Sequence, residues 1–226
     1  MKGLQLMARD ELDRQLLALR TNITDLCTFV DELLDRAFLT LAVGDPYDAR
    51  IAQTRENEFD RTCNDIEEKT VRLLTLQQPI LATDLRLLVG ALVVAQRLQR
   101  VGHGAFGIAK LAVELTDTPT SHDAAPAPLL ALGKDAHSAL TAAVTAFVEE
   151  RIELAQQVIN NEPQIDAEYR QQRDDYISRL SLPDEPGKEN DAGLPRKITY
   201  WLWIAHKLER VADHAVVIAR RVQQLQ

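Results

Sequence analysis

The sequence has few aromatic residues, few residues that favour turns, and only two cysteines. Aromatic residues make up 5% of its 226 residues, and there are nine glycines and nine prolines. A sandwich or barrel of short strands needs frequent turns, so this composition favours long helices around an aliphatic core. Cys27 and Cys63 form no CxxC pair, and we expect both to be small core residues rather than a disulfide or a zinc knuckle.

The sequence also lacks an excess of positive charge and any long apolar segment. Its formal net charge is −8, whereas proteins that bind nucleic acid concentrate basic residues to displace counterions from phosphates. The sequence contains no run of about 18 apolar residues, which a transmembrane helix would need, and its N-terminus lacks the apolar stretch of a signal peptide. We therefore expect a cytoplasmic protein that binds no nucleic acid.

Six stretches have the apolar periodicity of long helices. They run from about residue 9 to 43, 45 to 76, 83 to 115, 129 to 150, 152 to 181 and 195 to 225. In the first stretch, apolar residues recur every three or four positions, which places them on one face of a helix. These residues are Leu16, Leu19, Ile23, Leu26, Val30, Leu33, Leu34, Ala37 and Leu41. The sequence therefore predicts an all-α fold.

Two segments interrupt the helices and divide them into similar halves. The first, "TDTPTSHDAAPAP" at 116–128, contains the predicted linker, and the second, "PDEPGKENDAG" at 183–193, is a predicted acidic loop. The ten residues "QRLQRVGHGA" at 96–105 recur in form as "HKLERVADHA" at 206–215. We predict a tandem repeat of two three-helix bundles, with residues 1–117 and 129–226 as the bundles and 118–128 as the linker.

Pairs of acidic residues four positions apart recur in this repeat. The pairs are Glu56 and Asp60, Glu162 and Asp166, and Glu209 and Asp213. This spacing puts both carboxylates on one face of a helix, one turn apart. Where neighbouring helices bring two pairs to one level, the carboxylates repel unless protons, basic side chains or cations neutralise them. Mg²⁺, Ca²⁺, Mn²⁺ and iron suit such oxygen ligands, whereas Lys207, Arg210 or His214 offer neutralisation without metal.

The first bundle carries an altered version of the acidic frame. Gln99 and His103 stand where the second repeat has glutamate and aspartate, so a first site would have less negative charge and a lower metal affinity. Two interpretations follow for His103. It completes a mononuclear site with Glu56 and Asp60, since imidazole suits iron, zinc or nickel, or it only forms a hydrogen bond.

Several of these motifs together resemble the PhoU family of phosphate-signalling regulators. They are the frame "LERVADHA" at 208–215, the ExxxD pair one helix earlier, and the stretch "QQPILATDLRLL" at 77–88. The similar order of motifs extends from about residue 12 to 222. The resemblance implies a non-enzymatic, cytoplasmic negative regulator of the phosphate-starvation response that modulates phosphate uptake. It would link the ATPase subunit of a phosphate ABC transporter to a sensor histidine kinase.

The resemblance also implies metal sites, an oligomeric state and an indirect association with the membrane. By carry-over from the family, Glu162, Asp166, Glu209 and Asp213 form a complete metal-binding set in the second bundle, and Glu56 and Asp60 form an incomplete one in the first. The metal is not identified among Fe, Zn, Mg, Mn, Ni and Ca. The family further implies a homodimer that reaches the membrane only through its partners.

Two other classes of protein are compatible with long acidic helices. The first is a metal-free helical adaptor, in which the ExxxD pairs are ordinary surface charge. The second is a carboxylate-bridged oxidase or metal store of the ferritin type, which needs Glu-x-x-His pairs; none of the five histidines has a glutamate three residues before it. The sequence has no GxSxG, GxxxxGK[ST] or GxGxxG motif, so neither nucleophilic catalysis nor nucleotide binding is predicted.

Overall fold

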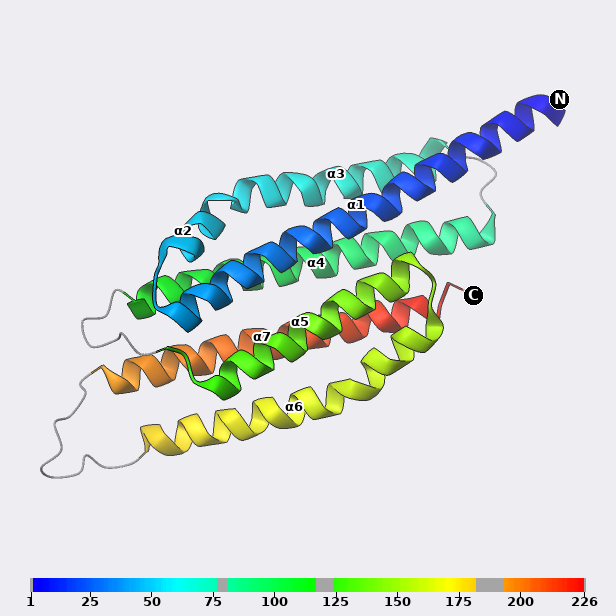
Figure 1. Ribbon diagram of the computed structural model, residues 1–226. Coiled ribbons are helices and arrows are strands. Elements are labelled where there is room, and N and C mark those ends of the chain that lie inside the picture. The colour runs from blue at the N-terminus through cyan, green and yellow to red at the C-terminus, as the bar shows by residue number, and fades with distance from the viewer. Residues whose placement is uncertain (1, 77–80, 117–123, 182–192, 226) are drawn as a thin grey trace, which may run out of the picture.

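The computed structural model describes residues 2–76, 81–116, 124–181 and 193–225, without the side chains of residues 2–8 and 76. These residues form seven α-helices and no strand. The helices are α1 (Lys2–Val43), α2 (Tyr47–Thr54), α3 (Glu56–Leu76), α4 (Ala82–Thr116), α5 (Ala127–Val148), α6 (Ile152–Leu180) and α7 (Leu194–Val222) (Figure 1). Most of the predicted linker and of the predicted acidic loop lies outside the described residues.

The helices form two three-helix bundles in tandem, as the sequence predicts. In the first, α3 packs on α1 and α4, with α2 as a short extension of α3; in the second, α6 packs on α5 and α7. The two bundles lie side by side, because α1 also packs on α5 and α4 on α7 (Figure 1). The predicted all-α tandem repeat is therefore confirmed. The exact domain boundaries stay a prediction, since residues 117–123, where the linker is predicted to begin, lie outside the described residues.

The single helix predicted over residues 45–76 is wrong, because it is divided into α2 and α3 at Arg55. No proline or glycine marks this break. The Arg55 guanidinium instead donates to Glu32 on α1 at 2.6 Å and to Glu58 on α3 at 3.0 Å. It also lies 4.0 Å above the ring centroid of Phe29, so tertiary contacts hold the residue at which the helix turns. The first acidic pair still lies on one helix, at the start of α3.

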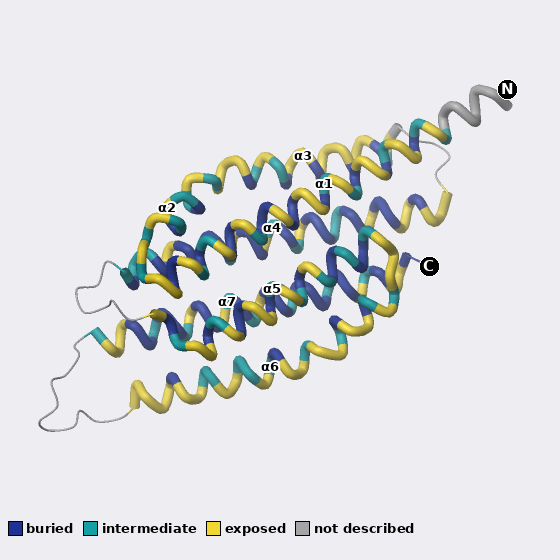
Figure 2. The backbone as a smooth tube through the Cα atoms, in the orientation of Figure 1, coloured by how far each residue is buried: buried dark blue, intermediate teal, exposed yellow. Residues whose placement is uncertain are grey.

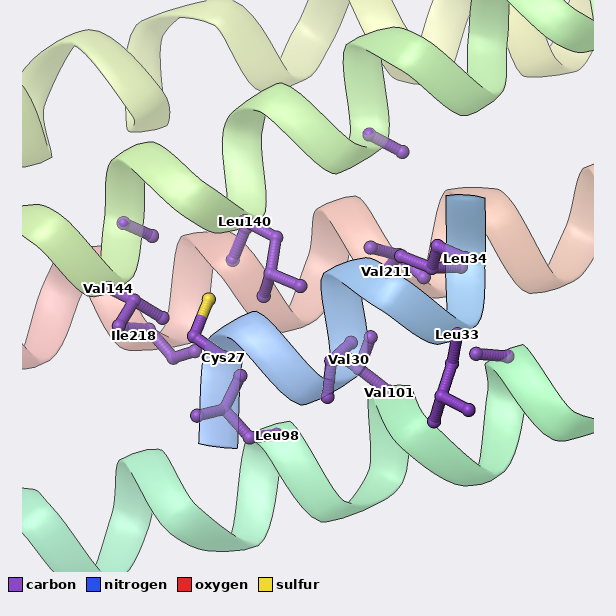
Figure 3. Packing of buried hydrophobic residues seen from close by; sticks show 14 of the residues in the cluster. Cys27, Val30, Leu33, Leu34, Leu98, Val101, Leu140, Val144, Val211 and Ile218 are labelled. Atoms are coloured by element: carbon purple, nitrogen blue, oxygen red, sulfur yellow. The ribbon is translucent and has the colours of Figure 1, made fainter. Parts of the chain in front are cut away.

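The hydrophobic core is aliphatic and continuous between the bundles. All nine apolar residues of the stripe predicted along the first helix are buried. Figure 2 shows that α3 and α6, the outermost helices, have many exposed residues, whereas buried residues concentrate on the helices between them. In Figure 3, Val30 and Leu34 of α1 lie among residues from α4, α5 and α7. Cys27 and Cys63 are buried and unpaired, as expected of small core residues.

An aromatic cluster fixes the distance between α3 and α4. Phe59 is fully buried, and its ring packs edge-on against Phe29 at 5.4 Å and Phe106 at 5.6 Å between centroids. Gly102 on α4 lies directly against this ring: a Cβ atom there would stand 2.1 Å from the ring's terminal carbon. Only glycine therefore allows α4 to approach α3 this closely beneath the first acidic pair.

A polar cluster joins the two bundles between α1 and α5. The His137 ring of α5 lies 2.8 Å from Asp31 and 3.8 Å from Asp35, both on α1. The Thr141 hydroxyl, one turn along α5, lies 3.5 Å from the same Asp31 oxygen. The hydrogen bond to Asp31 raises the pKa of His137, against a smaller opposing effect of burial, and the charges of Asp31 and Asp35 raise it further.

Replacing His137 with glutamine should cost about 1 kcal/mol more unfolding free energy at about pH 5.5 than at about pH 8.5. Because the folded state raises the pKa of His137, its charged interaction is fully present below the ordinary value of 6.5 and is lost as pH rises through the folded-state value. Urea unfolding of both proteins at the two pH values measures the difference. Asp31→Asn should show the same reduced pH dependence, and an equal cost at both values would contradict this origin of the stability.

Candidate functional site

The second bundle brings its two acidic pairs together on the facing sides of α6 and α7. Glu209 of α7 has a raised pKa, first because it is partly buried and then because of the negative charges of Asp213, Asp166 and Glu162, against a lowering by Arg210. The charges of the α6 pair thus act directly on Glu209. The four carboxylates predicted as one set lie in one neighbourhood.

Glu209 has an unsatisfied buried oxygen. Its Oε2 atom is shielded from solvent and has no hydrogen-bond partner among the described residues. Nδ1 of His206, one turn earlier on α7, lies 3.6 Å from it, which is beyond hydrogen-bonding distance. A buried carboxylate oxygen without a donor is costly in a protein that binds nothing there. A cation at this oxygen would remove both the cost and the repulsion from the neighbouring carboxylates.

Basic neighbours neutralise both aspartates of the set in this structure. Arg170 pairs with Asp166 one turn away on α6, and Arg210 donates to Asp213 at 3.0 Å on α7. Of the three basic residues that the sequence offered for the last pair, Arg210 takes this role. Lys207 and His214 instead face α4: Nζ of Lys207 lies 2.7 Å from where a Cβ of Gly107 would be.

The donor set fits a hard or borderline cation, although its side chains are not arranged around one point. In the described part of the chain, no three His, Cys, Asp or Glu side chains gather in a geometry that would hold a metal ion. The oxygens are of the type that such cations prefer. Binding therefore requires Asp166 and Asp213 to turn from their arginines toward Glu209.

The first bundle contains a hydrogen-bonded pair where the second has four carboxylates. Nε2 of His103 on α4 lies 2.8 Å from Oδ1 of Asp60 on α3, and the two side chains are 49% and 41% exposed. Glu56 is exposed in the first turn of α3, and Gln99 is partly buried on α4. The repeat therefore brings the corresponding positions of α3 and α4 together, as it does those of α6 and α7. Asp60 already has a partner in His103, which agrees with the interpretation of His103 as a hydrogen-bonding residue.

Two residues beside the second acidic set were not identified from the sequence. The Tyr169 hydroxyl of α6 lies 3.4 Å from Nδ1 of His206, and the two rings are 6.0 Å apart between centroids. Burial and then the charge of Glu209 raise the pKa of Tyr169. His206 precedes Glu209 by three residues and so had a spacing signal. Tyr169 had none, because its place depends on how α6 packs on α7.

Positive charges from both α4 and α7 act on the buried His214. The residue is 6% exposed. Burial first, and then the guanidinium charges of Arg210, Arg97 and Arg100, lower the pKa of His214 to about 4. The ring is therefore neutral at pH 7. Arg97 and Arg100 belong to α4, so charges from both helices act on this ring.

None of the helices in the described ranges is both long enough and apolar enough to cross a bilayer.

Comparison with known proteins gives one family throughout. The PhoU domain matches residues 23–112 and again residues 129–222. A phosphate-specific transport system accessory protein PhoU homolog from Streptococcus pneumoniae serotype 4 is 28% identical over 96% of both chains. One from Caulobacter vibrioides is 30% identical over 73% of this chain and 67% of the relative.

Solved structures agree with the arrangement of the helices. The crystal structure of PhoU from Pseudomonas aeruginosa has the same fold, with a TM-score of 0.82 at 23% identity over 94% of this chain and 97% of that one. The crystal structure of the phosphate transport system regulatory protein PhoU from Streptococcus pneumoniae has a TM-score of 0.80 at 26% identity over 95% and 96%. Since the domain matches both halves of the chain, with the acidic frames inside the matched residues, this protein belongs to the PhoU family.

Proposed function

We propose that this protein is a cytoplasmic, non-enzymatic accessory regulator of a phosphate-specific transport system. The observation that carries the proposal is the match over both repeats, together with a relative described as a phosphate-specific transport system accessory protein, which is similar along 96% of both chains. In this role it contacts the ATPase subunit of the transporter and a sensor histidine kinase, and it keeps the phosphate-starvation response off when phosphate is plentiful. It works as a homodimer and reaches the membrane through these partners.

Deletion of the gene tests this regulatory role. A phosphate-starvation reporter should become active in high-phosphate medium, and the intact gene supplied in trans should silence it again. Co-purification of the tagged full-length chain should recover the transporter ATPase and the kinase. A reporter that stays silent after deletion, with no recovery of either partner, would remove the proposal.

We further propose that Glu162, Asp166, Glu209 and Asp213 hold a cation between α6 and α7. The unsatisfied buried oxygen of Glu209 and the repulsion on it from the other three carboxylates support this site. Iron, Zn²⁺, Mn²⁺, Mg²⁺, Ni²⁺ and Ca²⁺ all accept such oxygens. Glu56 and Asp60 in the first bundle form a weaker site, to which His103 contributes only after leaving Asp60.

Protein carrying Glu209→Gln and Asp213→Asn should lose most of its bound metal. The two substitutions keep the shape of the side chains and remove two charges from the set, which should lower the cation affinity at least about tenfold. Metal analysis of protein purified without chelator measures this. Glu67→Gln with Asp65→Asn is the matched control, because both are exposed acids on α3. Equal metal in the site variant and the wild type would remove the site assignment.

One observation favours a metal-free helical adaptor as the second candidate. Asp166 and Asp213 are already neutralised by Arg170 and Arg210, so among the described residues of the set only Glu209 has a buried oxygen without a hydrogen-bond partner. The same metal analysis decides between the two: wild-type protein without bound metal, and without metal uptake on titration, supports the adaptor.

A further inference from the structure

A cavity of about 460 Å³ lies between α1 and α3 in the first bundle. The two helices run alongside each other here (Figure 1). One wall is formed by α1 between Gln15 and Asn22, and the other by α3 between Lys69 and Leu73. Sites for small molecules have volumes of roughly 300 to 1,000 Å³. The cavity is therefore large enough for a ligand, and no residue of the acidic pairs lines it.

The cavity stays open because α1 presents a short side chain to α3 at this level. Ala18 lies between Gln15 and Asn22 along the wall, and its methyl group does not fill the space. Leu19 and Leu73, which are 2% and 7% exposed, form an apolar floor that continues into the core. A flat apolar group that entered the cavity would therefore find aliphatic side chains to pack on.

The α3 side of the cavity carries two positive charges. Lys69 and Arg72 are three residues apart, so their side chains leave the same face of the helix. Both are exposed, and neither has an ion-pair partner among the described residues. A guanidinium binds two oxygens of a phosphate group at once, and an ammonium adds a point charge. The pair is thus available to a phosphate group at the edge of the cavity.

The α1 side of the cavity carries two side-chain amides. Nε2 of Gln15 donates to Oε1 of Glu11 at 2.7 Å, which leaves its carbonyl oxygen as an acceptor. The Asn22 side chain has no hydrogen-bond partner in the part of the chain that the structure describes, although it is partly buried. Its amide therefore offers a donor and an acceptor side by side. The edge of a nucleobase offers the complementary pair.

We propose that the cavity between α1 and α3 binds a nucleoside phosphate. The phosphate groups lie at Lys69 and Arg72, the base packs on the two leucines of the floor, and the Asn22 amide hydrogen-bonds to the edge of the base. An inorganic anion would use only the charges, and an alkyl chain would use only the leucines. A nucleotide uses all three kinds of group.

The lack of a glycine-rich phosphate motif in the sequence agrees with this mode of binding. Such motifs hold phosphates by the backbone N–H groups of a loop before a helix. In the α1–α3 cavity, side chains in the middle of two helices take this role instead. The site is independent of the regulatory function proposed above.

Calorimetry of the full-length protein with ADP and with GDP tests the site. EDTA is present, so that no divalent metal joins the nucleotide to the acidic pairs. Wild-type protein should bind at least one nucleotide, at least about tenfold more tightly than pyrophosphate, because pyrophosphate lacks the base. Lys69→Gln with Arg72→Gln should weaken this binding at least about tenfold. Lys110→Gln with Lys134→Gln removes the same charge from exposed positions on α4 and α5 and should change it less than about twofold.

Three further variants test the space and the amide separately from the charge. Ala18→Phe fills the cavity without changing its charge and should abolish binding, whereas Ala18→Ser keeps the space and should retain most of it. Residue 18 is exposed on a helix, so both variants should fold, which circular dichroism checks. Asn22→Leu removes the amide at similar size and should reduce the preference for the nucleotide over pyrophosphate to less than about threefold.

Three results would overturn the proposal. The first is wild-type protein that binds neither nucleotide. The second is equal affinity for pyrophosphate and the nucleotides, because the site would then recognise charge alone. The third is a loss in the Lys110 and Lys134 control as large as that in the cavity variant. None of them bears on the regulatory role, which the gene deletion tests.

Discussion

Replacing Phe59 with alanine is expected to lower the free energy of unfolding by about 3 to 5 kcal/mol. The side chain is fully buried, and it packs on Phe29, Phe106 and the bare backbone of Gly102. Alanine would leave a cavity that the two helices cannot close, because the neighbouring rings hold them apart. Chemical denaturation followed by circular dichroism measures the loss.

A leucine on the surface of the same bundle is the control for this result. Leu17 on α1 is 65% exposed, and Leu17→Ala should change the stability by less than about 0.5 kcal/mol. A cost below about 1 kcal/mol for Phe59→Ala would contradict the packing of α3 on α4. The hydrogen bond between Asp60 and His103 should weaken as well. Asp60 follows Phe59 directly, and the length of this bond depends on the distance between α3 and α4.

Converting Gln99 to glutamate and His103 to aspartate should create a full metal site in the first bundle. The substitutions would give α4 the acidic pair that α7 has, facing Glu56 and Asp60 on α3. Loss of the imidazole also releases Asp60 from its 2.8 Å hydrogen bond. We expect the affinity of this bundle for Mn²⁺ or Zn²⁺ to rise at least about tenfold, because two negative charges are added to the ligand set.

The measurement is clearest in protein whose second site is disabled. Metal titration of Gln99→Glu with His103→Asp, in the background of Glu209→Gln with Asp213→Asn, reports on the first bundle alone. Gln156→Glu with Asn160→Asp is the matched control: it creates an ExxxD pair on an exposed face of α6 that lacks the second pair. Equal gains in both proteins would show that one pair suffices. No gain in either would show that α3 and α4 do not hold four carboxylates at one level.

The order and faces of the helices could be predicted from the sequence because apolar residues recur at helical spacing. Every residue of the stripe from Leu16 to Leu41 is buried. The division at Arg55 could not be predicted, since neither glycine nor proline stands there. It depends on Glu32 and Phe29 of another helix, which lie near Arg55 only after the bundle has formed.

The candidate sites were predictable to the extent that they lie on single helices. The spacing of Glu209 and Asp213, and the repeat of their frame, indicated which faces carry acid. The buried oxygen of Glu209 and the contact of Tyr169 with His206 arise from packing between helices.

The continuous core described for α1, α4, α5 and α7 has a consequence for how the two repeats have diverged. Because each half completes the hydrophobic interior of the other, the duplicated halves behave thermodynamically as a dimer whose subunits are fused, with a single cooperative unfolding unit. The stability of the protein therefore depends on both bundles together, whereas each acidic frame involves residues of only one bundle. The first half can therefore carry Gln99 and His103 in place of an acidic pair without any change in its share of the common core.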